Sequence, residues 1–248
     1  MQNRDTIKNM QDVFLSVIVP AYNEEDRIRK TLKRFHDYLS TQPFSYEILV
    51  VSDGSKDRTA QIAEHMHAEI LNMSVINRKE NKGKGFSVRE GMLKANGRIK
   101  LFADADNATD ISHFDKMRPF FDKGFDIIIA SRDKKDALGA KQTVGQPWYK
   151  RLLGNLGNWY IQRLAVKGIW DTQCGFKAFR DYAAEKIFNE SKINRWMFDV
   201  EILALARKFN YKIGIIPANW INDPKTHVKF SSYLKSLWEV YKISQRIK

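Results

Sequence analysis

Two carboxylates one residue apart are the side chains of this sequence best placed to do chemistry. Asp104 and Asp106 come directly after the apolar run Ile99–Ala103, which is typical of a buried strand. At the end of such a strand the two carboxylates converge on a point where their oxygens could hold a hard divalent cation. Without a cation, the two like charges would repel each other. Short acidic triplets also occur in ordinary turns, so this pattern needs support from other segments.

Three other apolar runs also end in polar residues. They are the runs 14–19, 47–51 and 126–130, which lead into the polar segments 20–25, 52–57 and 131–132. In an open α/β sheet, ligands bind in the crevice beyond the carboxyl ends of the strands. Four such transitions in one chain therefore predict a nucleotide site at that edge of a sheet.

Helices are expected between these strands. Apolar residues recur at helical spacing in 28–39, and Asn23 is expected to cap that helix, because its side chain can accept a hydrogen bond from the first turn. Asp57 is the expected cap of a second helix that runs through His65. Acidic residues directly after Asn23 would also favour the positive end of the first helix.

The same alternation continues to a third strand and beyond. Residues 70–76 predict that strand, a helix is expected through Ala95, and 212–218 predict a late strand that closes the sheet. Strand, loop and helix repeated three times predict an α/β fold with a mostly parallel central sheet and right-handed crossovers.

Length and composition predict one domain. With 248 residues, of which 43% are hydrophobic, the chain can bury one substantial core. We expect an N-terminal extension at 1–12 without the apolar stretch of a secretory signal, a catalytic domain at 13–228 and an amphipathic basic helix at 229–248. The single cysteine, Cys174, excludes an internal disulfide framework and suits a reducing compartment. No apolar run is long enough to span a bilayer.

The loop 81–85 carries glycine and lysine but fits neither common nucleotide motif. Its spacing does not match a P-loop, and a dinucleotide fingerprint would follow the first strand, where 20–23 stands instead. A flexible loop that opens a helix, with Lys82, Lys84 and Arg89 nearby, suits a diphosphate bound by backbone amides and cations. A solvated basic turn is the alternative.

Seven segments in order resemble the motifs of family 2 glycosyltransferases with the GT-A fold. The resemblance covers 14–220, and its last two motifs are similar to the dolichyl-phosphate β-glucosyltransferase subgroup. The segments are Val19–Glu25, Asp53–Asp57, Asn81–Gly85, Asp104–Asp106, Ser131–Arg132, Asp171–Lys177 and Arg195–Glu201.

The resemblance implies a role for each matching residue. Asp104 and Asp106 would hold Mg²⁺ or Mn²⁺ against the diphosphate of a nucleotide sugar, Lys84 would approach the base or the diphosphate, and Arg132 would meet the acceptor phosphate. Gln173 would belong to the wall around the sugar or the acceptor. The pocket for base and ribose would be lined by Pro20, Ala21, Tyr22, Glu24 and Asp53. Ser52 stands where the family often has aspartate, which leaves base selectivity more open than metal binding.

The expected reaction is inverting transfer of glucose from UDP-glucose to a polyprenyl or dolichyl phosphate. A divalent cation and basic side chains would neutralise the departing diphosphate. A phosphate acceptor is already ionised and needs no general base, whereas a saccharide hydroxyl would need one. Asp199 and Glu201 are the candidates for that base or for binding sugar hydroxyls, unless they only favour a helix start. GDP-mannose is the alternative donor.

Membrane attachment is the second expectation. The formal net charge of +13 implies an acidic partner. Aromatic and basic residues alternate at helical spacing in 148–163 and 229–248, which is typical of helices that lie on an anionic membrane surface. Packing on the core is the alternative for each. We therefore expect a peripheral protein on the cytoplasmic face of a membrane, with or without a separate membrane-spanning partner.

Two other functions are alternatives to this enzyme. A nucleic-acid-binding protein would show base-stacking aromatics among its basic residues or a known module, and neither is apparent. A non-catalytic sugar-nucleotide sensor is the other alternative.

Overall fold

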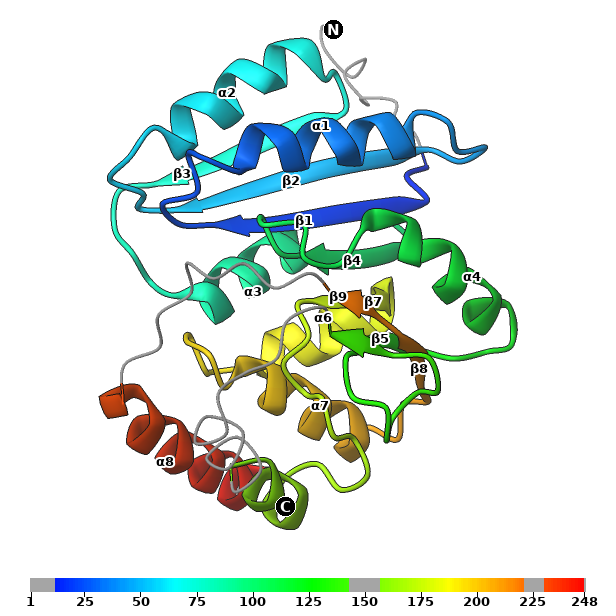
Figure 1. Ribbon diagram of the computed structural model, residues 1–248, viewed down its shortest axis with the longest axis vertical. Helices are drawn as coiled ribbons and strands as arrows, with labels where there is room; N and C mark the ends of the chain where they lie inside the picture. Colours follow the sequence, from blue (N-terminus) through cyan, green and yellow to red (C-terminus); the bar gives the residue numbers. More distant parts are fainter. Residues whose placement is uncertain (1–11, 143–156, 221–229, 248) are drawn as a thin grey trace, which may run out of the picture.

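A seven-stranded sheet forms the centre of the molecule in the computed structural model (Figure 1), which describes residues 12–142, 157–220 and 230–247. The strand order is β3-β2-β1-β4-β7-β5-β8. The strands are β1 Leu15–Ala21, β2 Tyr46–Asp53, β3 Met73–Arg78, β4 Ile99–Ala103, β5 Ile127–Ser131, β7 Phe176–Arg180 and β8 Ile213–Pro217. Two short strands, β6 Lys141–Gln142 and β9 Asn219–Trp220, pair in parallel beside this sheet.

Helices cover both faces of the sheet and bury a separate apolar core on each (Figure 1). Helices α1, α2 and α4 pack on one face, and α3, α6 and α7 pack on the other, with α8 beyond α7. Their bounds are α1 Ile28–Leu39, α2 Thr59–Glu69, α3 Lys84–Lys94, α4 Phe114–Asp122, α6 Asp181–Glu190, α7 Phe198–Lys208 and α8 Phe230–Arg246. A further helical segment spans 157–164. The predicted α/β fold with a mostly parallel central sheet is confirmed.

Strand β7 departs from the parallel pattern. It runs antiparallel to both of its neighbours, β4 and β5, whereas the pairs β1–β2, β1–β4, β2–β3 and β5–β8 are parallel. The late strand predicted at 212–218 is β8, and it forms the edge beside β5 as expected. The insertion of β7 brings the segment that precedes it, 171–175, to the edge where β4 ends.

The predicted cap of the first helix is wrong. Helix α1 begins at Ile28 without a side-chain cap, and Asn23 lies before it with a positive φ of 54°. Asparagine tolerates this conformation, and its Oδ1 accepts a hydrogen bond from the backbone N–H of Lys56 at 2.9 Å. Asn23 therefore joins the loops after β1 and β2. Asp57 is not the N-cap of α2 either, since Arg58 holds that position without a side-chain cap, but the Asp57 carboxylate accepts the N–H of Thr59, the first residue of the helix, at 2.9 Å.

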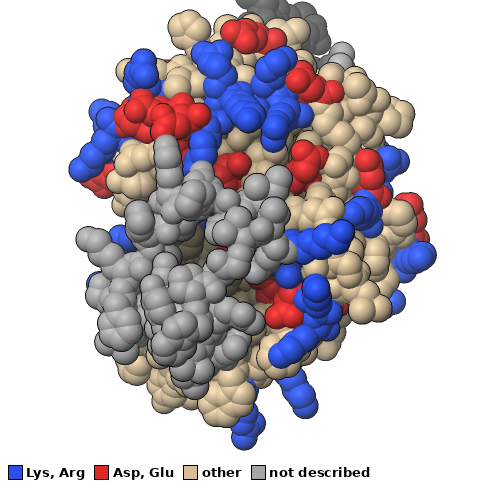
Figure 2. Space-filling model, in the orientation of Figure 1, with Lys and Arg blue, Asp and Glu red and all other residues tan. Residues whose placement is uncertain are grey.

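Charged side chains are spread over the surface that Figure 2 shows. Lys and Arg side chains lie over several separate parts of this face, with Asp and Glu side chains between them, and do not form one continuous stripe there. Among the described residues, none of the helices has the length and apolar character that crossing a bilayer would require. Part of the predicted amphipathic stretch at 148–163, with Trp148, Leu152 and Leu156, lies outside the described residues.

Candidate active site

The polar segments that follow β1, β2 and β4 meet at one edge of the sheet, as predicted. Strand β1 lies between β2 and β4 and is parallel to both, with Ala21 opposite Ser52 and Ile18 opposite Phe102. Parallel register places the carboxyl ends of neighbouring strands side by side. Asp53, the last residue of β2, and Asp104, which follows β4, therefore lie at the same edge.

Asp53 fixes the loop that precedes α3. Its carboxylate accepts the backbone N–H groups of Lys82 and Gly83, each at 2.7 Å, and pairs with the Arg78 guanidinium at 2.6 Å. Gly83 has a φ of 99°, a conformation that favours glycine. Two backbone hydrogen bonds to one buried carboxylate hold this loop on the sheet edge, so it is more than a free, solvated turn.

Lys84, the first residue of α3, reaches the predicted cation site. Its Nζ lies 2.6 Å from Asp104 Oδ1 and 5.7 Å from the centre of the Trp196 ring. Burial would lower the pKa of Lys84, but the nearby carboxylates of Asp104, Asp199 and Asp106 outweigh it and raise the pKa. The lysine therefore stays charged and neutralises part of the acidic edge.

Asp104 and Asp106 have the surroundings that a cation site needs. Burial, followed by the charge of Asp104, raises the pKa of Asp106, so a positive ion beside the pair would relieve a real electrostatic cost. A Cβ atom at Gly175 would overlap the Asp104 carboxylate, so glycine gives that carboxylate its space. In the described part of the chain no three His, Cys, Asp or Glu side chains are grouped to hold a metal. The two carboxylates fit an ion such as Mg²⁺ that takes its other oxygens from phosphates and water.

A second ion pair lies buried behind this site. Lys177 Nζ is 2.5 Å from Asp199 Oδ1, and both side chains are almost inaccessible to solvent. The same Nζ donates a hydrogen bond to the Cys174 carbonyl at 2.6 Å. Burial raises the pKa of Asp199, although Lys177 and Lys84 oppose this effect. The predicted base candidate Asp199 thus lies near Asp104 and Lys84, but it is already paired with a lysine.

Glu201, the other base candidate, is held by backbone and side-chain donors. It accepts the N–H groups of Lys192 at 2.9 Å and Ile193 at 2.8 Å, and it pairs with Arg246 of α8. Its side chain is fully buried. These contacts fasten the loop before α7 and the end of α8.

Arg132 lies at the end of β5 in a fixed orientation. Its Nε and Nη2 donate to Asp171 at 2.7 and 2.8 Å, and its backbone N–H donates to the same carboxylate at 2.8 Å. The guanidinium carbon lies 5.2 Å from the centre of the Trp220 ring. Burial alone would lower the pKa of Arg132, but Asp171 raises it. A permanently charged, oriented guanidinium is suited to bind an oxyanion.

The expected nucleotide-binding residues surround the end of β1. Pro20 and Ala21 are buried in the strand, whereas the Tyr22 side chain is 42% exposed at the edge. Glu24 pairs with Arg27 at 2.6 Å, and its pKa is raised first by burial and partly by the nearby charges of Asp106 and Asp104. Glu24 is therefore close to the acidic pair.

The chain matches a known protein family over most of its length. The sequence profile described as "Glycosyl transferase family 2" matches residues 16–188, from the second residue of β1 into α6. The chain belongs to glycosyl transferase family 2. A protein of Dictyostelium discoideum named "Dolichyl-phosphate beta-glucosyltransferase" is 34% identical over 256 residues, which cover 99% of this chain and 77% of the relative. A human protein of the same name is 37% identical over 236 residues, covering 89% of this chain and 72% of the relative.

Solved structures confirm the GT-A architecture of this family 2 glycosyltransferase. Glucosyl-3-phosphoglycerate synthase from Mycobacterium tuberculosis, crystallised with Mn²⁺, UDP and glucosyl-3-phosphoglycerate, superposes with a TM-score of 0.70 at 14% sequence identity. The match covers 95% of this chain and 80% of that structure. At this identity the likeness is one of fold.

Two side chains of the glycosyltransferase site were not predicted in their roles. Arg78, at the end of β3, binds Asp53 and Glu90 at 2.6 and 2.8 Å; its position at a strand end was the available signal. Lys177 lies in the predicted motif Asp171–Lys177, but its partner Asp199 lies 22 residues away in sequence, so the pair has no local signal. Gln173 itself is exposed beside Asp171.

Cys174, which lies next to these residues, is not activated as a nucleophile. Burial raises the pKa of its thiol to about 11, so the thiolate that would attack a substrate is scarce at neutral pH.

Proposed function

We propose that this glycosyltransferase moves glucose from UDP-glucose to a polyprenyl or dolichyl phosphate at the cytoplasmic face of a membrane, with Mg²⁺ or Mn²⁺ bound by Asp104 and Asp106. Curated relatives at 34% and 37% identity carry names that contain this donor sugar and this lipid phosphate. A neighbour of the same fold was crystallised with Mn²⁺ and UDP. The acidic edge described above supplies a site of the matching chemistry.

Residues at the donor end have separate tasks in this proposal. When bound, the metal neutralises charge on the departing diphosphate. Lys84 supplies a second positive charge there, and Asp53 holds the backbone before it, so the side chain starts from a fixed position beside the donor end. The exposed Tyr22 ring and the buried Pro20 and Ala21 form the wall for base and ribose, with Glu24 beside them.

The ion pair between Asp199 and Lys177 is the observation that favours a phosphate acceptor. A general base must be free to take a proton from the attacking group. Asp199 is paired with Lys177 at 2.5 Å, and Glu201 is occupied by two backbone N–H groups and Arg246. Cationic side chains therefore pair with both predicted base candidates, and backbone N–H groups also donate to Glu201. This arrangement favours an acceptor that arrives already ionised, as a phosphate does, over a saccharide hydroxyl.

Arg132 is the proposed contact for the acceptor phosphate. Its pairing with Asp171 uses the Nε and Nη2 edge, so we assign the phosphate to the N–H groups of Nη1. Asp171 then orients the guanidinium without consuming all of its donors. Lys135, whose Nζ lies 3.9 Å from the centre of the Trp170 ring, adds an exposed positive charge on the same loop.

Donor choice and metal use are tested together in one transfer assay. Radiolabelled UDP-glucose and GDP-mannose are offered separately with a short-chain polyprenyl phosphate, with Mn²⁺ or with excess chelator. We expect label to enter the organic phase from UDP-glucose with metal only. Preferential transfer from GDP-mannose would establish the mannosyl alternative, and full activity in chelator would contradict the metal role of Asp104 and Asp106.

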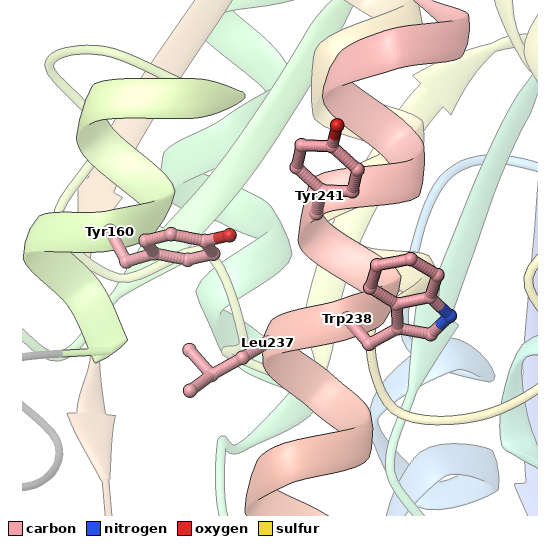
Figure 3. A pocket seen from close by; sticks show the side chains of 4 residues that line it. All are labelled: Tyr160, Leu237, Trp238 and Tyr241. Atoms are coloured by element: carbon pink, nitrogen blue, oxygen red, sulfur yellow. The ribbon is translucent and has the colours of Figure 1, made fainter.

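An aromatic surface beside α8 is the proposed membrane contact. Trp159 and Trp238 are 61% and 58% exposed. Between 157–164 and α8 lies an open pocket of about 350 Å³ (Figure 3), where Tyr160 and Leu237 face each other and Tyr241 lies one turn farther along α8. Lys242 lies 5.5 Å from the centre of the Trp238 ring. Exposed aromatic rings with cations beside them suit the headgroup layer of an anionic bilayer.

A further inference from the structure

Lys84 contacts one of the two carboxylates that are proposed to hold the metal ion. From this contact we infer that Lys84 is a resident cation that competes with the divalent metal for Asp104, and that metal binding releases it to the diphosphate of the donor. The inference rests on the proposed metal role of Asp104 and Asp106. Metal and nucleotide then bind cooperatively, because the Lys84 side chain must move from Asp104 to the diphosphate.

The contact distance makes joint occupation of one carboxylate oxygen electrostatically unfavourable. Lys84 Nζ lies 2.6 Å from Asp104 Oδ1, which is full hydrogen-bond contact. A divalent ion coordinated by the same oxygen would stand within a few ångströms of the ammonium, and repulsion between them would be large in this partly buried place. The lysine and the metal therefore compete for that oxygen.

The backbone of this segment stays fixed while the side chain can move. Asp53 holds the N–H groups of Lys82 and Gly83, and the N–H of Phe86 donates to the Asn194 carbonyl at 3.1 Å. A Cβ atom at Gly85 would collide with the Ile193 carbonyl, so the first turn of α3 is packed closely. Four methylene groups of Lys84 then provide the movement.

The neighbouring carboxylates offer no resting place to a displaced Lys84. Asp199 and Asp106 are the other acids close to the ammonium, but Asp199 already pairs with Lys177 at 2.5 Å, and Asp106 belongs to the carboxylate pair proposed to hold the metal. The remaining partner for the displaced charge is an incoming anion. Trp196, with its ring 5.7 Å from Nζ and 51% exposed, marks the open side of the site. A nucleoside diphosphate that enters there would meet the released ammonium.

Manganese binding without substrate is the test. Free Mn²⁺ is measured by electron paramagnetic resonance during titration of the wild type, Lys84→Met and Lys82→Met. Removing one positive charge in contact with Asp104 should tighten Mn²⁺ binding by about tenfold or more. Lys82→Met removes the same charge from a lysine that lies over the Phe86 ring, and it should leave the affinity within about twofold of wild type. Thermal unfolding shows whether each variant is folded, and Lys84→Gln replaces Lys84→Met if it is not.

Cooperativity provides the second readout. In the wild type, UDP should tighten Mn²⁺ binding strongly, and Mn²⁺ should tighten UDP binding by the same factor. In Lys84→Met this coupling factor should shrink, because no side chain has to be moved. Unchanged affinity for Mn²⁺ alone in Lys84→Met, with normal binding in the presence of UDP, would overturn the inference and leave the proposed function intact. Absence of Mn²⁺ binding to every form, with or without UDP, would overturn both.

Discussion

Gly175 gives the Asp104 carboxylate the space in which it lies. A Cβ atom at this position would overlap the carboxylate carbon and oxygens, and the Gly175 carbonyl accepts the Asp104 N–H at 3.1 Å. We predict that Gly175→Ala lowers kcat by about a hundredfold or more, because displacing a positioned group by about 1 Å has effects of that size. Activity and thermal unfolding of the purified variant are the measurements. Wild-type activity in a folded Gly175→Ala protein would show that this carboxylate position is not critical.

Asp171 should make folding stability depend on acidity. Burial alone would raise the pKa of its carboxyl, but Arg132 outweighs burial and lowers it. The folded pKa is thus below the unfolded one, so the pair stabilises the fold above the ordinary aspartate value of about 3.9 and loses this contribution as the pH falls further. Asp171→Asn, which does not titrate there, should lose stability less steeply below about pH 4. Urea unfolding at several pH values measures this, and identical slopes in the two proteins would contradict it.

At the scale of elements, the Lys177–Asp199 pair connects β7 with the start of α7. Both partners are buried and lie 2.5 Å apart, so removing one leaves an uncompensated charge inside the protein. Lys177→Met should lower the free energy of unfolding by about 3–5 kcal/mol. The double variant Lys177→Met/Asp199→Leu should recover part of that loss, because neither charge remains. Denaturant unfolding measures both, and a double variant as unstable as the sum of its singles would argue against the pair.

Local patterns were sufficient to predict most elements but not their long-range partners. The apolar spacing in 28–39 predicted α1, and the strand ends at Asp53 and Asp104 predicted the edge that they share. The cap at Asn23 failed because a contact with Lys56, 33 residues away, competes with the helix end. The antiparallel insertion of β7 depends on register between Phe102 and Lys177, which neither segment specifies by itself.

At the scale of the whole molecule, the sheet gathers the site from distant parts of the chain. Segments after β1, β2 and β4, the loop before β7 and the start of α7 all contribute to one acidic edge. Sequence order predicted the first three, because parallel strands place their ends together. The engagement of Asp199 by Lys177 and of Arg132 by Asp171 could not be predicted, since each pair is made across the fold.

The aromatic surface beside α8 makes a separate prediction for the whole molecule. Trp238→Ala should weaken binding to phosphatidylcholine vesicles that contain phosphatidylglycerol by about tenfold, the effect expected when one large apolar side chain no longer enters the interface. Leu71→Ala is the matched control, because Leu71 is 90% exposed between α2 and β3. Co-sedimentation measures both variants. Equal binding by Trp238→Ala and the wild type would exclude this surface as the contact.

Acceptor choice tests most directly whether the site works without a general base. A short-chain polyprenyl phosphate and the corresponding polyprenol, which differ only in the phosphate, are offered with radiolabelled UDP-glucose and Mn²⁺. With Asp199 paired to Lys177, glucose should pass to the phosphate and not to the alcohol, and Arg132→Ala should raise the KM for the phosphate. Transfer to the polyprenol or to a saccharide hydroxyl at a comparable rate would contradict the proposed mechanism.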